Sequence, residues 1–380
     1  MVPFDFQPRT RVVFGQGAFE RLGPLARDLG FRRTLLVADP GIVRTGRAAA
    51  ALQLLQAAGI EAVIFQDFDQ NPDSAMVDAG RAFAAPFAPD SVIGLGGGSS
   101  LDCARGINFL LTNSGAIADY RGYGKARRPL LPSIGVPTTA GTGSEAQSYA
   151  VISDAATHMK MACGDPTAAA RIALLDPDLT LTAPPRVTAM AGFDAIAHAV
   201  ETTVTSRRTA MSETFSQQAW RLLASAFERV LLHPADVEAR ASMLVGSHLA
   251  GLAIEQSMLG AAHACANPLT ARHDIPHGLA LAMLLPHVVR WNAGVAHDRY
   301  ATLLGAPRRR ARDEDAAEAL ARRLEDFARA GGLAMRLRDA GVEADSLPEL
   351  ASLAAQQWTG TFNPRRFDPA GALEIYRAAH

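Results

Sequence analysis

The first half of the chain alternates short apolar runs with longer segments of helical composition. Thr34–Asp39 and Glu61–Phe65 are apolar runs of strand length. Gly46–Gly59 (GRAAAALQLLQAAG) predicts a helix that ends in glycine, and the segment from Ser74 to about Phe87 predicts another. Strands that alternate with helices predict an α/β domain whose parallel sheet is covered by helices on both faces.

The pattern changes after LTAPPRV (Leu181–Val187). Long segments rich in alanine and leucine, with few β-branched residues, run from there to the end of the chain and predict an all-helical domain. The pair Pro184–Pro185 marks the break. A chain of 380 residues also exceeds the roughly 250–300 residues that one hydrophobic core supports. We therefore predict an α/β domain over residues 1–182 and an all-α domain over residues 183–380.

Composition and charge narrow the possible partners. The chain is 48% hydrophobic and 20% charged, with a formal net charge of −1. Its one basic run, in APRRRARDED (residues 306–315), passes directly into acidic residues and predicts a solvated helix face. No apolar run approaches the ~18–20 residues of a membrane span. We therefore expect neither nucleic acid nor a membrane as a partner.

Cysteine usage and the N-terminal segment bear on the compartment. Cys103, Cys163 and Cys265 are scattered, odd in number and without CxxC spacing, which is typical of buried thiols in a reducing compartment. The opening residues MVPFDFQPRTRVVFG lack the basic-then-apolar pattern of a signal peptide. We expect a cytoplasmic protein.

A glycine-rich turn, GLGGGSSLD (Gly94–Asp102), lies between an apolar strand and a predicted helix. Glycines let backbone N–H groups approach a ligand closely, and a helix N-terminus attracts an anion. Ser99 and Ser100 can cap the helix or donate to phosphate oxygens. The spacing is not GxGxxG. A nucleotide-phosphate site and a tight structural turn are therefore both open interpretations.

Asp39 ends the first predicted strand. An acid at this position commonly hydrogen-bonds a ribose hydroxyl and repels a 2′-phosphate. The same residue also opens the turn DPG, which explains an aspartate without any ligand. A ribose contact and a structural turn are therefore both open interpretations of Asp39.

Two segments carry candidate metal ligands. In GFDAIAHAVE, Asp194 and His198 are four residues apart and share one helix face. In GAAHACANPLTARHDIPHG, His263 lies on a predicted helix and His277 follows Pro276 at the entry to the next one. One aspartate and three histidines suit Fe²⁺ or Zn²⁺ and are too rich in nitrogen for Mg²⁺ or Ca²⁺.

Two other histidines and a structural interpretation compete with this set. His273 is predicted in the polar loop, and His287 lies in LLPHVVRW, where a satisfied core or capping histidine is the commoner outcome. Either the histidines of the set are satisfied structural residues, or they hold an ion.

Four separated motifs resemble the iron-containing (group III) alcohol dehydrogenase family. These are GGGSSLD, PTTAGTGSEA, GFDAIAHAVE and AAHACANPLTARHDIPHGLALAMLLPHVVRWN, and the opening RVVFGQGAFERLG is similar to the family's first strand and turn. The likeness runs from about residue 5 to the end of the chain. It implies the architecture shared with dehydroquinate synthases, in which an N-terminal nucleotide-binding α/β domain precedes a helical metal-binding domain.

The resemblance assigns roles to individual residues. It implies four metal ligands: Asp194, His198, His263 and His277. It also implies contacts to the dinucleotide from Asp39, Asn71, Gly97, Gly98, Ser99, Asp102, Thr138, Thr139, Thr142 and Lys160. An acid at the position of Asp39 favours NAD over NADP in the family.

One position departs from the family pattern. Many members have a second histidine in HxxxHPL, where this chain has Asn267 in HACANPL. Asn267 shares a helix face with His263, so we expect it to face the active site, together with Lys160 of HMKMA. Because asparagine does not titrate near neutral pH, this position lacks the titratable group that a proton relay needs.

The function that the resemblance implies is hydride transfer between NAD(H) and a small alcohol and its aldehyde or ketone. The metal would act as a Lewis acid on the substrate oxygen, and a homodimer is common in the family. Alternatives are a glycerol dehydrogenase-like or maleylacetate reductase-like member, a dehydroquinate synthase, and a non-catalytic protein that binds metal and nucleotide. The complete ligand set argues against a maleylacetate reductase, and the lack of a dense Lys/Arg cluster argues against a dehydroquinate synthase.

Overall fold

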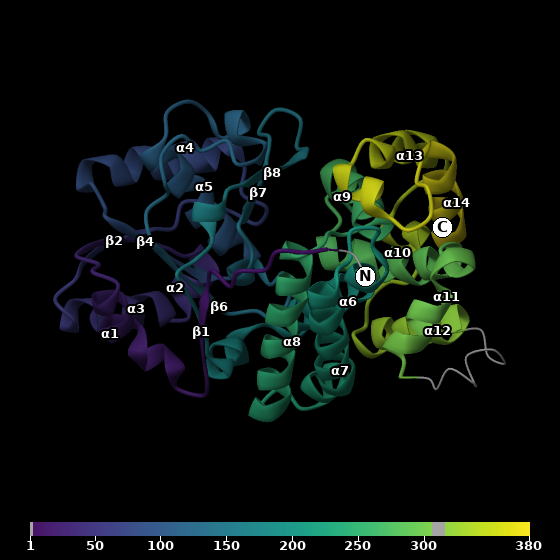
Figure 1. The fold of residues 1–380 in the computed structure, drawn as a ribbon, viewed down its shortest axis with the longest axis horizontal. Coiled ribbons are helices and arrows are strands. Elements are labelled where there is room, and N and C mark those ends of the chain that lie inside the picture. The colour runs from purple at the N-terminus through teal and green to yellow at the C-terminus, as the bar shows by residue number, and fades with distance from the viewer. Residues whose placement is uncertain (1–2, 306–315) are drawn as a thin grey trace. The chain divides into compact units, whose positions relative to one another are not determined.

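The computed structural model describes residues 3–305 and 316–380, and the chain separates into two compact units (Figure 1). The sheet unit comprises residues 7–139 and 143–183. The helical unit comprises Pro184–His380, Ala140–Thr142 and the segment up to Phe6. The predicted boundary at residue 182 would place the segment up to Phe6 and the segment Ala140–Thr142 in the first domain. The structure groups both with the helical unit.

The main sheet is parallel and has six strands in the order β1-β9-β6-β4-β2-β3. Its strands are β1 (Arg11–Phe14), β2 (Arg33–Val37), β3 (Glu61–Phe65), β4 (Ser91–Gly96), β6 (Ser133–Pro137) and β9 (Ile172–Leu175). Along β2, Leu35 and Val37 belong to one hydrophobic core and Leu36 to the other. Because successive side chains of a strand point to opposite faces, the sheet is buried on both sides.

Helices cover both faces of this sheet. They are α1 (Leu22–Asp28), α2 (Pro40–Arg44), α3 (Arg47–Ala57), α4 (Ser74–Ala84) and α5 (Gly98–Thr112). Leu25 of α1 and Leu55 of α3 pack in one core, whereas Val77 of α4 and Ile107 of α5 pack in the other. The predicted α/β fold with a parallel, doubly covered sheet is confirmed.

A second, three-stranded sheet has the order β5-β8-β7. It consists of β5 (Gly122–Tyr123), β7 (Tyr149–Ser153) and β8 (Lys160–Gly164). β7 and β8 are antiparallel, and the connection between them spans residues 154–159. A connection this short closes a hairpin and cannot form a parallel crossover. β5, β7 and β8 thus form a sheet of their own, apart from the main one.

The described part of the helical unit contains helices and no strands. The α-helices are α6 (Pro185–Val204), α7 (Ala210–Leu232), α8 (Val237–Glu255), α9 (Ala261–His273), α10 (His277–Trp291), α11 (Ala293–Leu303), α12 (Ala316–Ala330), α13 (Leu347–Ala355) and α14 (Pro369–Ala379). The predicted all-α character is confirmed for these residues. The solvated helix face predicted for residues 306–315 lies outside the described residues.

None of the described helices alone has both the length and the apolar composition needed to cross a membrane. The pair α10 and α11 reaches both together, but the chain bends by 111° at the break between them.

Helix α6 is the central helix of the helical unit. It begins at Pro185, whose fixed φ and missing N–H suit the first helical position. It packs against α7, α8 and α10, and its residues from Gly192 to Val204 are all buried. Any polar side chain on this segment is therefore buried too and needs a partner. Its polar residues include Asp194, His198 and Glu201.

Candidate metal centre

Asp194 and His198 face each other along α6. They lie one helical turn apart, and Oδ1 of Asp194 is 3.2 Å from Nε2 of His198. Each residue is only 5% exposed. The helix therefore presents a carboxylate and an imidazole together inside the core.

Two further helices bring His263 and His277 to the same carboxylate. His263 lies in the first turn of α9 and His277 is the first residue of α10. Their Nε2 atoms lie 3.5 Å and 3.9 Å from Oδ1 of Asp194. One ligand atom each from Asp194, His263 and His277 lies within 4.8 Å of the others, a spacing that could hold a metal ion. The ring of His198 stacks on that of His263 with centroids 4.8 Å apart.

The polar atoms at the centre of this group fit a cation. Within the described part of the chain, neither Oδ1 of Asp194 nor Nε2 of His263 has a hydrogen-bond partner, and both atoms are buried. Buried polar atoms are rarely left without partners. An acidic oxygen among imidazole nitrogens is the donor set that Fe²⁺ or Zn²⁺ accepts. The residues present therefore fit a divalent transition metal ion.

Burial and the neighbouring side chains shift the pKa values of Asp194, His198 and His263. Burial lowers the pKa of His198 to about 4. Burial also favours neutral His263, but the carboxylates of Glu201 and Asp194 outweigh it and raise the pKa of His263 to about 9. For Asp194, burial opposes ionisation, yet the surrounding histidines hold its pKa well below the usual range. Metal binding at His263 therefore competes with protonation of its ring.

Glu201 is the residue of this group that sequence reasoning missed. Its Oε1 accepts a hydrogen bond from the backbone N–H of Ala262 at 2.7 Å, and its Oε2 contacts Nδ1 of His263. A signal was present in the sequence, because positions 194, 198 and 201 repeat at the spacing of one helix face.

The structure also places the two weaker candidates and Asn267. His273 is the last residue of α9 and does not lie in a loop as predicted, since the helix continues past Pro268. His287 lies within α10, where burial lowers its pKa. Asn267 lies one turn after His263 on α9, and its Nδ2 donates to Oε1 of Gln357 at 3.2 Å.

The glycine turn connects β4 directly to α5. Gly96 has φ +147°, and a Cβ there would collide with the side chain of Ser100. Gly97 is the N-cap of α5 and provides no side-chain cap. A Cβ at Gly97 would lie 3.2 Å from Oγ1 of Thr139, so the backbone of the turn closely approaches this threonine. Gly98 begins the helix.

The two serines of the turn hold neighbouring segments. The hydroxyl of Ser100 donates to Oδ2 of Asp39 at 3.0 Å, and Oγ of Ser99 accepts from the N–H of Asn71 at 3.3 Å. Oδ1 of Asp39 caps α2 by accepting from Gly41 and Ile42. Asp39 and Asn71 therefore both lie next to the glycine turn, and their positions are fixed by hydrogen bonds.

The other predicted dinucleotide contacts come from several elements: Thr138, Thr139 and Thr142 follow β6, Asp102 lies on α5, and Lys160 begins β8. The N–H of Thr138 donates to the carbonyl of Gly96 at 2.9 Å. Asp102 pairs with Arg105 at 3.2 Å and accepts from Ser144 at 2.7 Å. Burial raises the pKa of Asp102, against the attraction of Arg105 and of Lys160. Thr142 belongs to the helical unit.

A parallel sheet with a glycine turn, together with a buried aspartate–histidine cluster on helices, suits a protein that binds a nucleotide and a divalent metal ion. The model of the family "Iron-containing alcohol dehydrogenase" matches residues 8–177, and the model of its C-terminal domain matches residues 188–380. The chain belongs to the iron-containing alcohol dehydrogenase family. The predicted enzyme class, a metal- and NAD-dependent oxidoreductase of alcohols and aldehydes, is confirmed by this membership.

Individual relatives match along nearly their whole length. A 1,3-propanediol dehydrogenase of Klebsiella pneumoniae is 32% identical over 99% of this chain and 98% of the relative. A lactaldehyde reductase of Escherichia coli is 31% identical over 96% and 97%. The solved structure of a sulfoacetaldehyde reductase from Bifidobacterium kashiwanohense in complex with NAD⁺ superposes with a TM-score of 0.89 at 26% identity, covering 100% of this chain and 99% of that one.

Proposed function

We propose that this chain interconverts a small alcohol and its aldehyde or ketone with NAD(H), using one divalent ion held by Asp194, His198, His263 and His277. The observation that carries the proposal is the buried carboxylate oxygen of Asp194, which three imidazole Nε2 atoms face at 3.2–3.9 Å. Fe²⁺ is the ion we expect, and Zn²⁺ suits the same donors.

Each part of the chain has a distinct task in this proposal. The chemistry that a divalent ion supplies at such a site is Lewis-acid stabilisation of negative charge on a substrate oxygen. The turn at Gly97, Gly98 and Ser99 binds the pyrophosphate through backbone N–H groups at the start of α5. Asp39 binds the adenosine ribose, and Asn71, Asp102 and Lys160 line the same site. We assign contacts with the dinucleotide to Thr138, Thr139 and Thr142 as well.

Asn267 is the polar neighbour of the metal centre that we assign to substrate binding. It lies on the helix that carries His263, and its amide is tied to Gln357. An amide can donate and accept hydrogen bonds but cannot take up a proton near neutral pH. The alcohol proton therefore leaves by another route, through water or a ribose hydroxyl of the coenzyme.

Metal removal tests this function. Protein treated with a chelator until elemental analysis finds no iron or zinc is expected to lose alcohol-dependent NADH formation, because the charge on the substrate oxygen is then uncompensated. Activity should return with Fe²⁺ or Zn²⁺. Full activity without metal would contradict the role of the ion. Binding of metal and NAD without turnover on any of a panel of short alcohols and aldehydes would contradict the proposed substrate class.

Coenzyme choice gives a second test, through Asp39→Asn. The carboxylate at the end of β2 should repel the 2′-phosphate of NADP, and asparagine removes that charge while still capping α2. The ratio of kcat/KM for NADP⁺ to that for NAD⁺ should rise about tenfold, the effect of ~1.4 kcal/mol. The thermal midpoint serves as the control and should not change. An unaltered ratio would show that Asp39 does not select the coenzyme.

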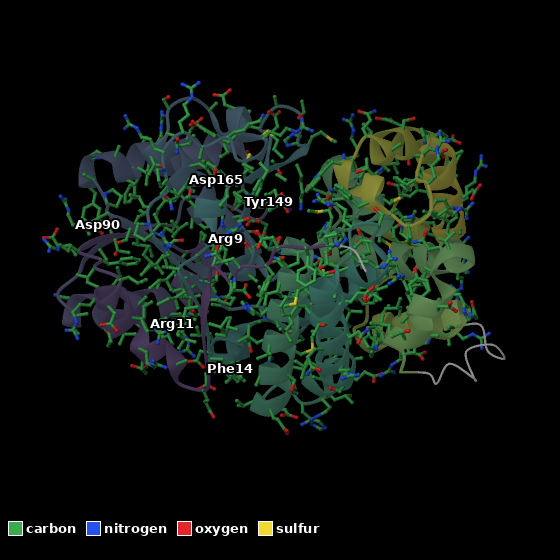
Figure 2. All side chains as sticks on the ribbon, viewed as in Figure 1. Arg9, Arg11, Phe14, Asp90, Tyr149 and Asp165 are labelled. Atoms are coloured by element: carbon green, nitrogen blue, oxygen red, sulfur yellow. The ribbon has the colours of Figure 1, made fainter. Side chains whose placement is uncertain are left out.

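We also propose a cytoplasmic homodimer. β1 is an edge strand of the main sheet, and Val12 and Phe14 on it are 45% and 49% exposed. Figure 2 labels Arg11 and Phe14 at the two ends of this strand. Exposed edge strands favour pairing with another strand, and two-fold pairing is the commonest form of oligomer. Sedimentation of the chain at 40.2 kDa would contradict the dimer.

The three cysteines are free thiols, which agrees with the proposed cytoplasmic location, a reducing compartment. Cell fractionation tests this location.

A further inference from the structure

Glu201 is a buried carboxylate on α6 that faces the first turn of α9. It lies three residues after His198 and is 3% exposed. Oε1 accepts from the N–H of Ala262 at 2.7 Å, and Oε2 contacts Nδ1 of His263. Both carboxylate oxygens therefore have partners on the helix that carries a proposed metal ligand.

The beginning of α9 depends on partners from other segments. Its N-cap, Gly260, has no side chain to cap the helix. The N–H of Ala261 donates to Oδ1 of Asn363 at 3.3 Å, and the next N–H donates to Glu201. A Cβ at Gly260 would lie 3.1 Å from Oε1 of Glu201, so the glycine leaves room for the carboxylate. First-turn amides lack partners within a helix and favour negative charge, so Glu201 anchors α9 on α6.

The carboxylate of Glu201 also determines which ring nitrogen of His263 carries the hydrogen. A carboxylate only accepts hydrogen bonds, so Nδ1 of His263 must be the donor. In a neutral imidazole, the other nitrogen, Nε2, then carries the lone pair. Nε2 is the atom that lies 3.5 Å from Oδ1 of Asp194 and that, among the described residues, has no hydrogen-bond partner.

We propose that Glu201 is a positioning residue of the metal centre, which fixes the start of α9 and keeps the hydrogen of His263 on Nδ1 so that Nε2 is free to bind the ion. The inference rests on the metal site of the proposed function. Carboxylates behind metal-bound histidines fix the orientation of the ring, and their loss typically costs about 10- to 100-fold in metal affinity.

Glu201→Gln tests the proposal because it keeps the shape of the side chain but replaces one acceptor oxygen with an NH₂ donor and removes the negative charge. The two partners of Glu201 are both donors, whereas an amide offers one acceptor and one donor group. In either orientation of the glutamine amide, its NH₂ group faces one of these two partners in place of an acceptor oxygen. If the NH₂ group faces Nδ1 of His263, the ring hydrogen moves to Nε2 and blocks that atom. If it faces the N–H of Ala262, the start of α9 loses its anchor. Binding of Co²⁺ by metal-stripped protein, measured by competition with a chelator, should weaken about 10- to 100-fold.

Thr203→Val is the matched control. Thr203 lies two residues later on the same helix, is equally buried, and donates only to the carbonyl of Ala199 within α6. This variant should bind Co²⁺ like the unsubstituted chain. Equal Co²⁺ affinity in E201Q and T203V would overturn the proposal, and so would a lower thermal midpoint of E201Q with unchanged affinity. Failure of the unsubstituted chain to bind Co²⁺ would instead refute the proposed metal site itself.

A second measurement does not depend on the folding of the variant. In ¹⁵N-histidine-labelled, unsubstituted protein loaded with Zn²⁺, the ¹⁵N shifts should assign the ring hydrogen of His263 to Nδ1. A ring of His263 with its hydrogen on Nε2, or with Nδ1 bound to the ion, would overturn the proposal.

Discussion

Asp194→Asn is expected to lower kcat/KM for alcohol oxidation by about 1,000-fold, because the site loses its only negatively charged ligand. Oδ1 of Asp194 is the atom that all three proposed imidazole ligands face, at 3.2–3.9 Å. An amide oxygen keeps the shape of this ligand but not its charge. Loss of the ion removes several kcal/mol of charge stabilisation from the transition state, and each 1.36 kcal/mol is a factor of ten in rate.

Three measurements separate this effect from misfolding: kcat/KM, metal content by elemental analysis, and the thermal midpoint with and without added Zn²⁺. The variant should fold but gain no stability from Zn²⁺, because only binding to the folded state shifts the midpoint. Asp236→Asn is the control. Asp236 caps α8 in the same unit by accepting from Ala239, and asparagine caps equally well. A D194N protein that keeps its metal and its activity would refute the assignment of Asp194.

The sequence predicted those parts of the fold that depend on local pattern. The apolar runs and the helix boundaries follow from residues that are neighbours in the chain, as in α4, which begins at Ser74 as predicted. The hairpin of β7 and β8 was not foreseen as a separate sheet. Its runs have the same composition as buried parallel strands, and only the short connection at residues 154–159 distinguishes them.

For the candidate site, the sequence supplied donor types but not distances. The pair Asp194 and His198 follows from helix periodicity alone. The approach of His263 and His277 to Asp194 depends on how α9 and α10 pack on α6, which no local pattern encodes. The contact between Asn267 and Gln357 joins residues 90 positions apart and could not be predicted for the same reason. The burial of Glu201 against the start of α9 depends on the same packing, since a glutamate is ordinarily exposed.

Gly278→Ala is expected to lower both stability and metal affinity, although it touches no proposed ligand. Gly278 is the second residue of α10, directly after His277. An added Cβ would collide with the backbone oxygen of Met190 on α6 and lie 2.7 Å from its carbonyl carbon. Because these are backbone atoms, no side chain can rotate away. The first turn of α10 must move, and His277 moves with it, away from Asp194.

The expected cost of this overpacking is about 1–3 kcal/mol in the free energy of unfolding, with a weaker Co²⁺ affinity in the metal-stripped protein. Gly294→Ala, in the first turn of α11, is the matched control, because nothing lies within 4 Å of the added Cβ. Alanine is favoured over glycine in a helix by about 0.5–1 kcal/mol, so G294A should be neutral or more stable. Thermal midpoints and Co²⁺ competition measure both variants. A G278A protein that matches G294A in both would mean that the close approach of α10 to α6 does not position His277.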